Sequence, residues 1–219
     1  MRSWPPPSLS RWLSRPMNGI GSDAFALVWD GTRLHGLNAS GRAPEAWAPQ
    51  RFAGLQAMPR TGWDSVTVPG AVSAWVALSA KFGRLPFAEL FAASLEYAER
   101  GFLVSPIVAR QWQTQGPQLQ DQPGFAAAFL PGGRAPYAGE LFRHPRRRAR
   151  CKPSPNRAVR PSIAAPWRKI AAASRAQGGA MTAEDLAAHQ PDWVEPIGQD
   201  YRGLRLHEIP PTDKASQRS

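Results

Sequence analysis

The stretch AFALVWDGTRLHGLNA, residues 24–39, has the pattern of two short strands around a turn. The segments AFALVW (residues 24–29) and RLHGLN (residues 33–38) flank the pair Asp30-Gly31. An Asp-Gly pair supplies the positive φ angle that tight hairpin turns require. The sequence therefore predicts a β-hairpin, preceded by the glycine-rich run NGIGSD. Because a phosphate-binding loop leads from a strand into a helix, a run that leads into a strand does not predict a nucleotide site.

Two helices are predicted downstream of the hairpin. The segment VPGAVSAWVALSAKFG (residues 68–83) has apolar residues at helical spacing and closes on a glycine, the residue that commonly follows a helix C-terminus. These apolar residues are Ala71, Trp75, Leu78 and Phe82. The segment LPFAELFAASLEYAERG (residues 85–101) repeats the pattern and also ends on a glycine. We expect the aromatic side chains of both helices to pack in a core.

The later part of the chain predicts a short helix followed by a strand. In MTAEDLAAHQP, Thr182 stands at the N-cap position and Asp185 follows three residues later, which is the spacing of a capping box. Pro191 then ends the helix. The segment YRGLRLHEIP (residues 201–210) has the pattern of a single strand.

Neither a metal site nor a cofactor is predicted. The four histidines are scattered singly, without the spacing of metal ligands, so we expect each to be a surface or packed residue. They are His35, His144, His189 and His207. The single cysteine, Cys151, excludes an internal disulfide and a site built from several cysteines.

The net charge of +11 is concentrated in two segments. Residues 146–169 contain nine Lys or Arg and no acid, residues 1–16 contain three and no acid, and the rest of the chain is close to neutral. A basic run of this kind leaves open a nucleic-acid-binding or scaffold function through residues 143–169. However, Trp167 is the only aromatic residue there, and base stacking usually needs several, so no specific nucleic acid is expected as a partner.

The sequence does not predict a membrane partner. No apolar run approaches the roughly 20 residues that span a bilayer. The start MRSWPPPSLSRWLSRP has prolines where a signal peptide has its apolar centre. As written, the chain is expected in the cytoplasm, and a periplasmic or cytoplasmic location stays open for the parent protein.

Four segments together resemble the gamma-glutamyltransferase family, also called gamma-glutamyltranspeptidases. They are MNGIGSDAFALVWDGTRLHGLNASGRAP (residues 17–44), VPGAVSAWVAL (residues 68–78), GRLPFAELFAASLEYAERGFLVSPIVARQW (residues 83–112) and GGAMTAEDLAAHQPDWVEPIGQDYRGLRLHEIPP (residues 178–211). They occur in the family's order within residues 17–145 and 170–211, which make up roughly three quarters of the chain. The resemblance is specific as a set, although no single piece would be sufficient.

This resemblance implies an α+β fold, a four-layer αββα sandwich of the N-terminal-nucleophile hydrolase type that lacks its small-subunit half. The family's precursor cuts itself before a threonine, whose hydroxyl becomes the nucleophile and whose freed α-amine becomes the base. The implied activity is transfer of a gamma-glutamyl group from a donor such as glutathione to water or an amine, through a threonine ester. The matching residues resemble the large subunit, so we assign no catalytic residue and expect the chain alone to be inactive.

One substrate-binding residue, Arg42, is a candidate. When Ala43-Pro44 is aligned with the family's Ala-Pro, the arginine that holds the substrate carboxylate falls at Ser40. Arg42 lies two residues further on, and its guanidinium is suited to bidentate binding of a carboxylate. A surface or structural role for Arg42 stays open at this point.

A shift of reading frame would explain where the sequence departs from the family. Translated back into G/C-rich codons and read in another frame, residues 1–16 give AVVAAALALAVVEPA, residues 146–169 give a peptide containing GEAFYRG, and residues 212–219 give NGQGIAAL. Each peptide resembles the family at that point. We therefore interpret these three segments as an out-of-frame leader, an out-of-frame and disordered basic segment, and an aberrant tail. The family-like regions are residues 17–145 and 170–211.

Three functions are open on the sequence alone. The first is a truncated or frameshifted large-subunit fragment that is inactive by itself. The second is an enzyme that becomes active by pairing with a separately encoded small subunit. The third is the basic nucleic-acid-binding or scaffold protein described above. The first is the main prediction.

Overall fold

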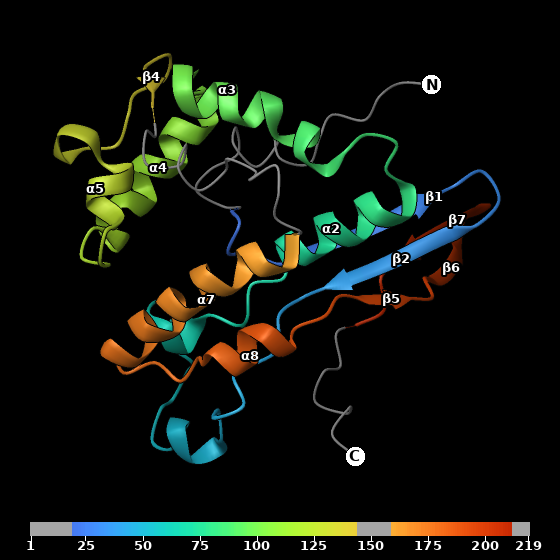
Figure 1. Ribbon diagram of the computed structural model, residues 1–219, viewed down its shortest axis with the longest axis horizontal. Helices are drawn as coiled ribbons and strands as arrows, with labels where there is room; N and C mark the ends of the chain where they lie inside the picture. Colours follow the sequence, from blue (N-terminus) through green and yellow to red (C-terminus); the bar gives the residue numbers. More distant parts are fainter. Residues whose placement is uncertain (1–18, 144–158, 212–219) are drawn as a thin grey trace. The chain divides into compact units, whose positions relative to one another are not determined.

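The computed structural model describes residues 19–143 and 159–211, with side chains in the second stretch described from Trp167 onward. The chain divides into two compact units (Figure 1). One contains residues 20–81 together with the stretch that begins at Val159, and the other contains the described residues from Phe82 to Arg143. Because Arg42 belongs to the first unit, that unit carries the candidate site.

The first unit is built on a three-stranded antiparallel sheet of order β1-β2-β5. The predicted hairpin forms its first two strands, β1 (Ala24–Trp29) and β2 (Leu34–Ala39). In the turn, the Asp30 N–H donates to the Arg33 carbonyl at 3.2 Å, and Gly31 has a φ of 107°. The hairpin prediction is therefore confirmed, with the second strand beginning one residue later than predicted. The third strand, β5 (Asp192–Val194), pairs with β2.

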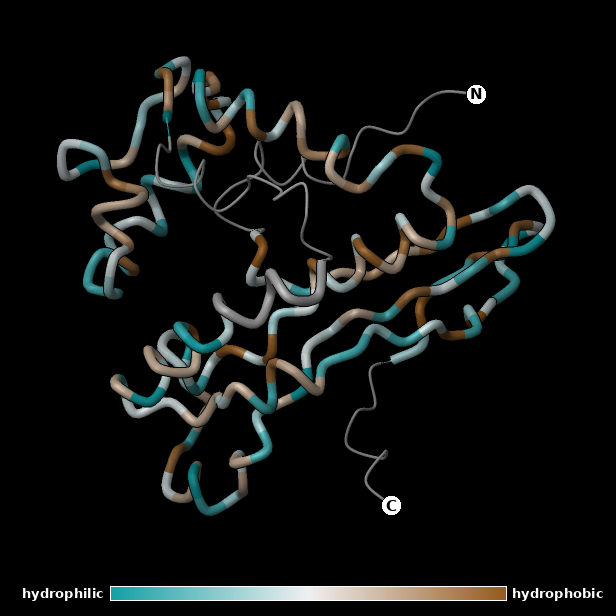
Figure 2. Tube along the Cα trace, in the orientation of Figure 1, coloured by the Kyte–Doolittle hydropathy of each residue, from teal (hydrophilic) through white to brown (hydrophobic). Residues whose placement is uncertain are grey.

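The sequence predicted a helix over residues 68–83, and helix α2 (Ala71–Phe82) confirms it. This helix covers one face of the sheet. Hydrophobic residues recur along it (Figure 2). Leu37, Ala39 and Ala74 are buried between helix and sheet, with partly buried neighbours around them. Because side chains alternate across a strand, Phe25 and Trp29 of β1 point to the other face, where both are exposed.

Helices α7 (Val159–Ala176) and α8 (Ala183–Ala188) complete the helical part of this unit. The disorder predicted for residues 146–169 is wrong from Val159 onward, whereas residues 144–158 lie outside the described part of the chain. The physical reason is an apolar stripe at helical spacing that the count of charges concealed. The stripe consists of the partly or fully buried residues Trp167, Ile170 and Ala171.

A second hairpin follows β5. Strands β6 (Ile197–Tyr201) and β7 (Leu204–Glu208) pair as a two-stranded sheet, and their turn residues Arg202 and Gly203 have φ angles of 49° and 79°. The prediction of a single strand over residues 201–210 was therefore wrong for residues 201–203, which form the end of β6 and the turn. Tyr201 ends one strand and Leu204 begins the next, because Gly203 tolerates the positive φ that a tight turn requires.

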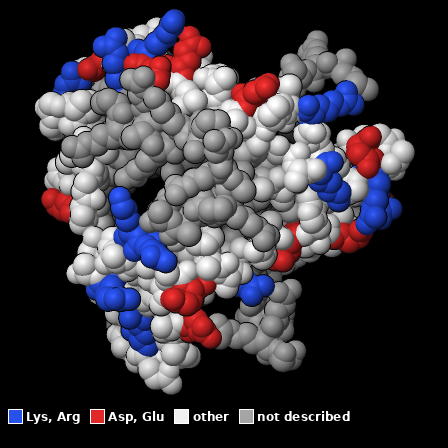
Figure 3. All heavy atoms as spheres, viewed as in Figure 1, with Lys and Arg blue, Asp and Glu red and all other residues white. Residues whose placement is uncertain are grey.

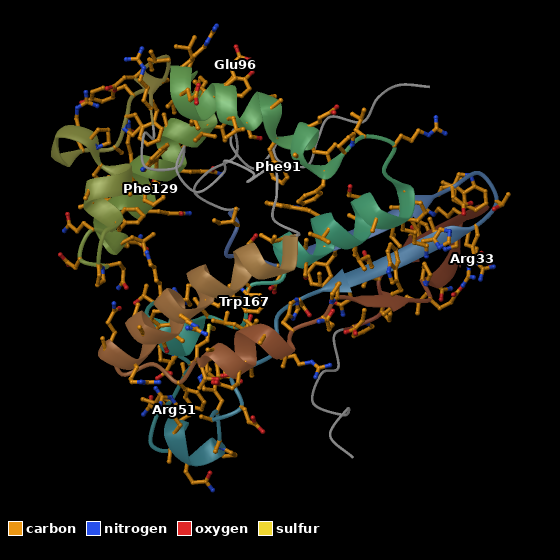
Figure 4. All side chains as sticks on the ribbon, in the orientation of Figure 1. Arg33, Arg51, Phe91, Glu96, Phe129 and Trp167 are labelled. Carbon is orange, nitrogen blue, oxygen red and sulfur yellow. The ribbon has the colours of Figure 1, made fainter. Side chains whose placement is uncertain are left out.

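Two 3-10 helices, η1 (Pro49–Phe52) and η2 (Trp63–Ser65), lie in the long loop between β2 and α2. This loop is tied to the end of α7 by polar contacts. Arg51 binds the Asp64 carboxylate at 2.8 Å and donates to the Gly178 carbonyl at 2.6 Å. The Trp63 indole N–H donates to the Gln177 side chain at 3.0 Å. Figure 4 labels Arg51 in this loop and Trp167 on α7.

The second unit has its own helical core. It begins with η3 (Phe87–Phe91) and α3 (Ala92–Arg100), so the predicted helix of residues 85–101 is confirmed with a 3-10 start. The other elements are β3 (Phe102–Leu103), α4 (Pro106–Leu119), α5 (Phe125–Phe129), η4 (Pro131–Gly133) and β4 (Leu141–Phe142). Trp112 is central to this core, with its ring centroid 4.7 Å from that of Phe142.

Candidate functional site

The candidate residue Arg42 lies in the loop that leaves β2, and its side chain is exposed. Ser40, which takes the place of the family's arginine in the alignment, is instead buried, at 7% exposure. A buried hydroxyl in a loop can shape the site but cannot reach out to a ligand in solution. Of the two positions, only Arg42 therefore presents a positive charge that a carboxylate could bind.

The backbone of this loop is held by three hydrogen bonds from different segments. The Ser40 N–H donates to Oδ1 of Asn38 at 2.9 Å, and the Gly41 N–H donates to Oδ1 of Asp23 at 2.9 Å. The carbonyl of Arg42 accepts from the Val68 N–H at 3.0 Å. Although its side chain is exposed, Arg42 thus extends from a backbone that is fixed on both sides.

Two glycines allow the segment before α2 to cross this loop at very short range. A Cβ atom on Gly41 would lie 1.5 Å from the Val68 carbonyl oxygen, and one on Gly70 would lie 1.8 Å from the Ala39 carbonyl oxygen. No side chain fits at either position, since real Cβ contacts are about twice as long. Glycine at both positions is therefore a requirement of the close backbone crossing.

His189, which the sequence showed only as an isolated histidine, lies next to the crossing of the two backbone segments at Gly70. Its Nε2 lies 3.0 Å from the Ser73 hydroxyl, and that hydroxyl donates to the Gly70 carbonyl at 2.6 Å. Because the hydroxyl proton is directed to Gly70, Nε2 contacts Ser73 as a donor. His189 is 8% exposed, so of the two predicted alternatives, a surface or a packed residue, it is the packed one.

A polar cluster fixes the turn of the β1–β2 hairpin. Oδ1 of Asp30 accepts from the Arg33 N–H at 2.8 Å, and its Oδ2 lies 2.7 Å from Nε2 of His35. The hydrogen bond from His35 is the largest of the causes that hold the pKa of Asp30 well below its usual range. On its other nitrogen, His35 meets Nζ of Lys81 at 3.3 Å, which ties the hairpin to the end of α2.

Charges on the face of the molecule drawn in Figure 3 are mixed in sign. Figure 3 shows Lys and Arg side chains interspersed with Asp and Glu. Most of the basic run of residues 143–169 lies outside the described residues, and its described end is part of α7. Within the described ranges, no helix is long and apolar enough to cross a membrane, and no three acidic, histidine or cysteine side chains gather as metal ligands would.

The comparisons with known proteins agree with the segments that suggested a family. The family model described as Gamma-glutamyltranspeptidase matches residues 13–216. The chain belongs to the gamma-glutamyltranspeptidase family. It is 30% identical over 206 residues to the glutathione hydrolase-like YwrD proenzyme of Bacillus subtilis, a match that covers 90% of this chain. It is 32% identical over 206 residues to the oxamate amidohydrolase proenzyme of Klebsiella pneumoniae, again over 90% of this chain.

A solved structure shows the same fold. The cephalosporin acylase from Bacillus halodurans superposes with a TM-score of 0.81 at 38% identity, over 93% of this chain. The predicted fold class, the N-terminal-nucleophile hydrolase sandwich in part, is therefore confirmed. This chain spans 38%, 39% and 40% of the lengths of the two proenzymes and the acylase.

Proposed function

We propose that this chain supplies the part of a gamma-glutamyltransferase-type enzyme that holds the carboxylate of the acyl donor, with Arg42 as the binding residue. The observation that carries the proposal is the Arg42 loop, where an exposed guanidinium extends from a backbone held by Asp23 and Val68. Because the backbone is already fixed, binding has to order only the side chain and not the loop. Membership of the family supports a donor of this chemistry.

The names of the relatives support a carboxylate as the shared feature of the substrate. Glutathione and oxamate each contain an amide bond and a carboxylate. A guanidinium can bind either carboxylate through two parallel N–H···O bonds, and this interaction orients the neighbouring amide. We therefore propose a gamma-glutamyl donor such as glutathione for the parent enzyme, with water or an amine as the acceptor.

The acyl chemistry itself would need a threonine freed at the start of a small subunit. Its hydroxyl would attack the donor's carbonyl while its α-amine accepts the hydroxyl proton, and that proton would then leave with the departing amine. Water or an acceptor amine would finally break the threonine ester. We assign no residue of these 219 to those steps, and we propose that the chain alone binds donor without turning it over.

The role of Arg42 can be tested by titrating the chain, labelled with ¹⁵N at arginine, with L-glutamate. We expect one Nε–Hε resonance to shift saturably, and we expect the shift to disappear in Arg42→Ala. The exposed Arg60 of the same unit provides a matched control, so Arg60→Ala should titrate like the parent chain. Equal affinity of Arg42→Ala and the parent chain for L-glutamate would exclude this role.

A further inference from the structure

We infer that helix α8 is the element that positions the Arg42 loop, and that Asp185 and His189 are its positioning residues. The inference rests on the proposed function of Arg42. Helix α8 has only six residues, yet it contacts this region by three different interactions. They reach the chain after Arg42, the side chain of Val68, and the backbone at Gly70.

The first contact is made by Asp185, whose two carboxylate oxygens have separate partners. Oδ2 accepts from the Thr182 N–H at 2.9 Å and completes the predicted capping box, which is confirmed. Oδ1 accepts from the Glu45 N–H at 2.9 Å. Glu45 is three residues beyond Arg42, so one carboxylate both starts the helix and holds the outgoing end of the loop.

The second contact is apolar. Leu186 of α8 is 3% exposed and is buried in one cluster with Val68 and Met181. Val68 is the residue whose N–H binds the Arg42 carbonyl at 3.0 Å. Burial of its side chain against α8 therefore fixes the donor of the hydrogen bond that holds Arg42 itself.

The third contact follows the end of the helix. His189 donates to the Ser73 hydroxyl at 3.0 Å, which in turn donates to the Gly70 carbonyl at 2.6 Å. Gly70 is where the segment before α2 crosses β2 without space for a side chain. This chain of hydrogen bonds holds the backbone at the crossing, two residues after Val68.

The three contacts hold the chain on both sides of Arg42. A helix that served only to stabilise the fold would not need contacts on both sides of this one residue. Asp185 holds the chain after Arg42, and Leu186 and His189 hold the segment that binds its carbonyl. Small displacements of a binding group weaken a bidentate interaction strongly, because its geometry is strict. A shift of α8 is therefore expected to lower affinity without removing any group that touches the ligand.

The test combines amide hydrogen exchange with L-glutamate titration on the full chain. In Asp185→Ala we expect the exchange rate of the Glu45 amide to rise about tenfold relative to amides of the β1–β2 ladder. In His189→Leu we expect the exchange rate of the Val68 amide to rise about tenfold relative to the same amides. L-glutamate affinity should fall by about five- to tenfold in both variants. His189→Gln keeps a donor near the position of Nε2, so its Val68 exchange rate and its affinity for L-glutamate should both be close to those of the parent chain.

Thr182→Ala is the matched control for helix stability. It removes the capping hydroxyl and leaves the contact between Asp185 and Glu45, so Glu45 exchange should stay close to that of the parent chain. Unchanged exchange at Glu45 and Val68 in the Asp185 and His189 variants would overturn the inference. Faster exchange with unchanged L-glutamate affinity would also overturn it. If the parent chain does not bind L-glutamate while the amides respond as expected, the proposed function fails, and the control of the loop by α8 stands.

Discussion

Gly41 determines how closely the Arg42 loop can approach the segment before α2. The sequence shows a glycine in SGRAP, but a close approach between residues 41 and 68 depends on the fold and leaves no local pattern. The Asp30-Gly31 turn was predictable because its signal is local. Arg42 could be proposed only through the resemblance to the family, whereas the roles of Gly70 and His189 depend on contacts in the fold that leave no local pattern.

The substitution Gly41→Ala is expected to destabilise the chain by about 2–3 kcal/mol, because the new Cβ atom would force the Val68 backbone away. Its position would otherwise be 1.5 Å from the Val68 carbonyl oxygen. Urea unfolding measures the change. Gly21→Ala is the control, because a Cβ atom at Gly21 would have no atom within 4 Å apart from those of its neighbours in the chain. Equal midpoints for the two variants would contradict the close crossing.

The Asp30 cluster gives the hairpin a pH dependence. Because the pKa of Asp30 is lower in the folded chain than in the unfolded chain, its contribution is present above the unfolded value and is lost as the pH falls below it. The free energy of unfolding should therefore decrease below about pH 4. Glu140, in the other unit, has a pKa lowered mainly by its hydrogen bond with Arg134 and changes stability in the same direction.

Comparison with Asp30→Asn separates the pH dependence that comes from Asp30 from the pH dependence that comes from Glu140. The variant cannot lose a charge at this position, so its urea midpoint should fall less than that of the parent chain between about pH 5 and pH 3. The measurement is a series of urea unfolding curves at these pH values. Parallel curves for the two proteins would show that the contact between Asp30 and His35 does not contribute.

At the scale of elements, the periodic segments were predictable and the segments with mixed signals were not. The helix of residues 71–82 and the capping box at Thr182 follow local rules of spacing and hydrogen bonding. Helix α7 was missed because nine positive charges and several prolines dominate residues 146–169. The residues that anchor it, from Trp167 onward, are few but correctly spaced.

The substitution Trp167→Ala tests whether α7 is packed against the rest of its unit. Trp167 is partly buried against the cluster of Val68, Met181 and Leu186, so its loss should destabilise the chain by about 1–3 kcal/mol, less than for a fully buried tryptophan. Urea unfolding again measures the effect, with the exposed Arg168→Ala as the neighbouring control. A Trp167 variant as stable as the Arg168 variant would show that this end of α7 is not packed.

For the whole molecule, the family could be predicted because four segments together resemble it and occur in its order, although no single segment would be sufficient. The reading-frame shift is still our proposal for residues 1–16, 146–169 and 212–219. The gene's nucleotide sequence tests it. We expect the alternative frame to encode family-like peptides at all three places, and a frame that encodes unrelated peptides would exclude it.

The most direct test of the account is p-nitroaniline release from gamma-glutamyl-p-nitroanilide by the purified chain of 219 residues. We predict no release above the rate in buffer, because we assign the nucleophile and its base to a threonine of the small subunit and not to any residue of this chain. Release in proportion to the amount of chain, with no companion subunit present, would contradict the account.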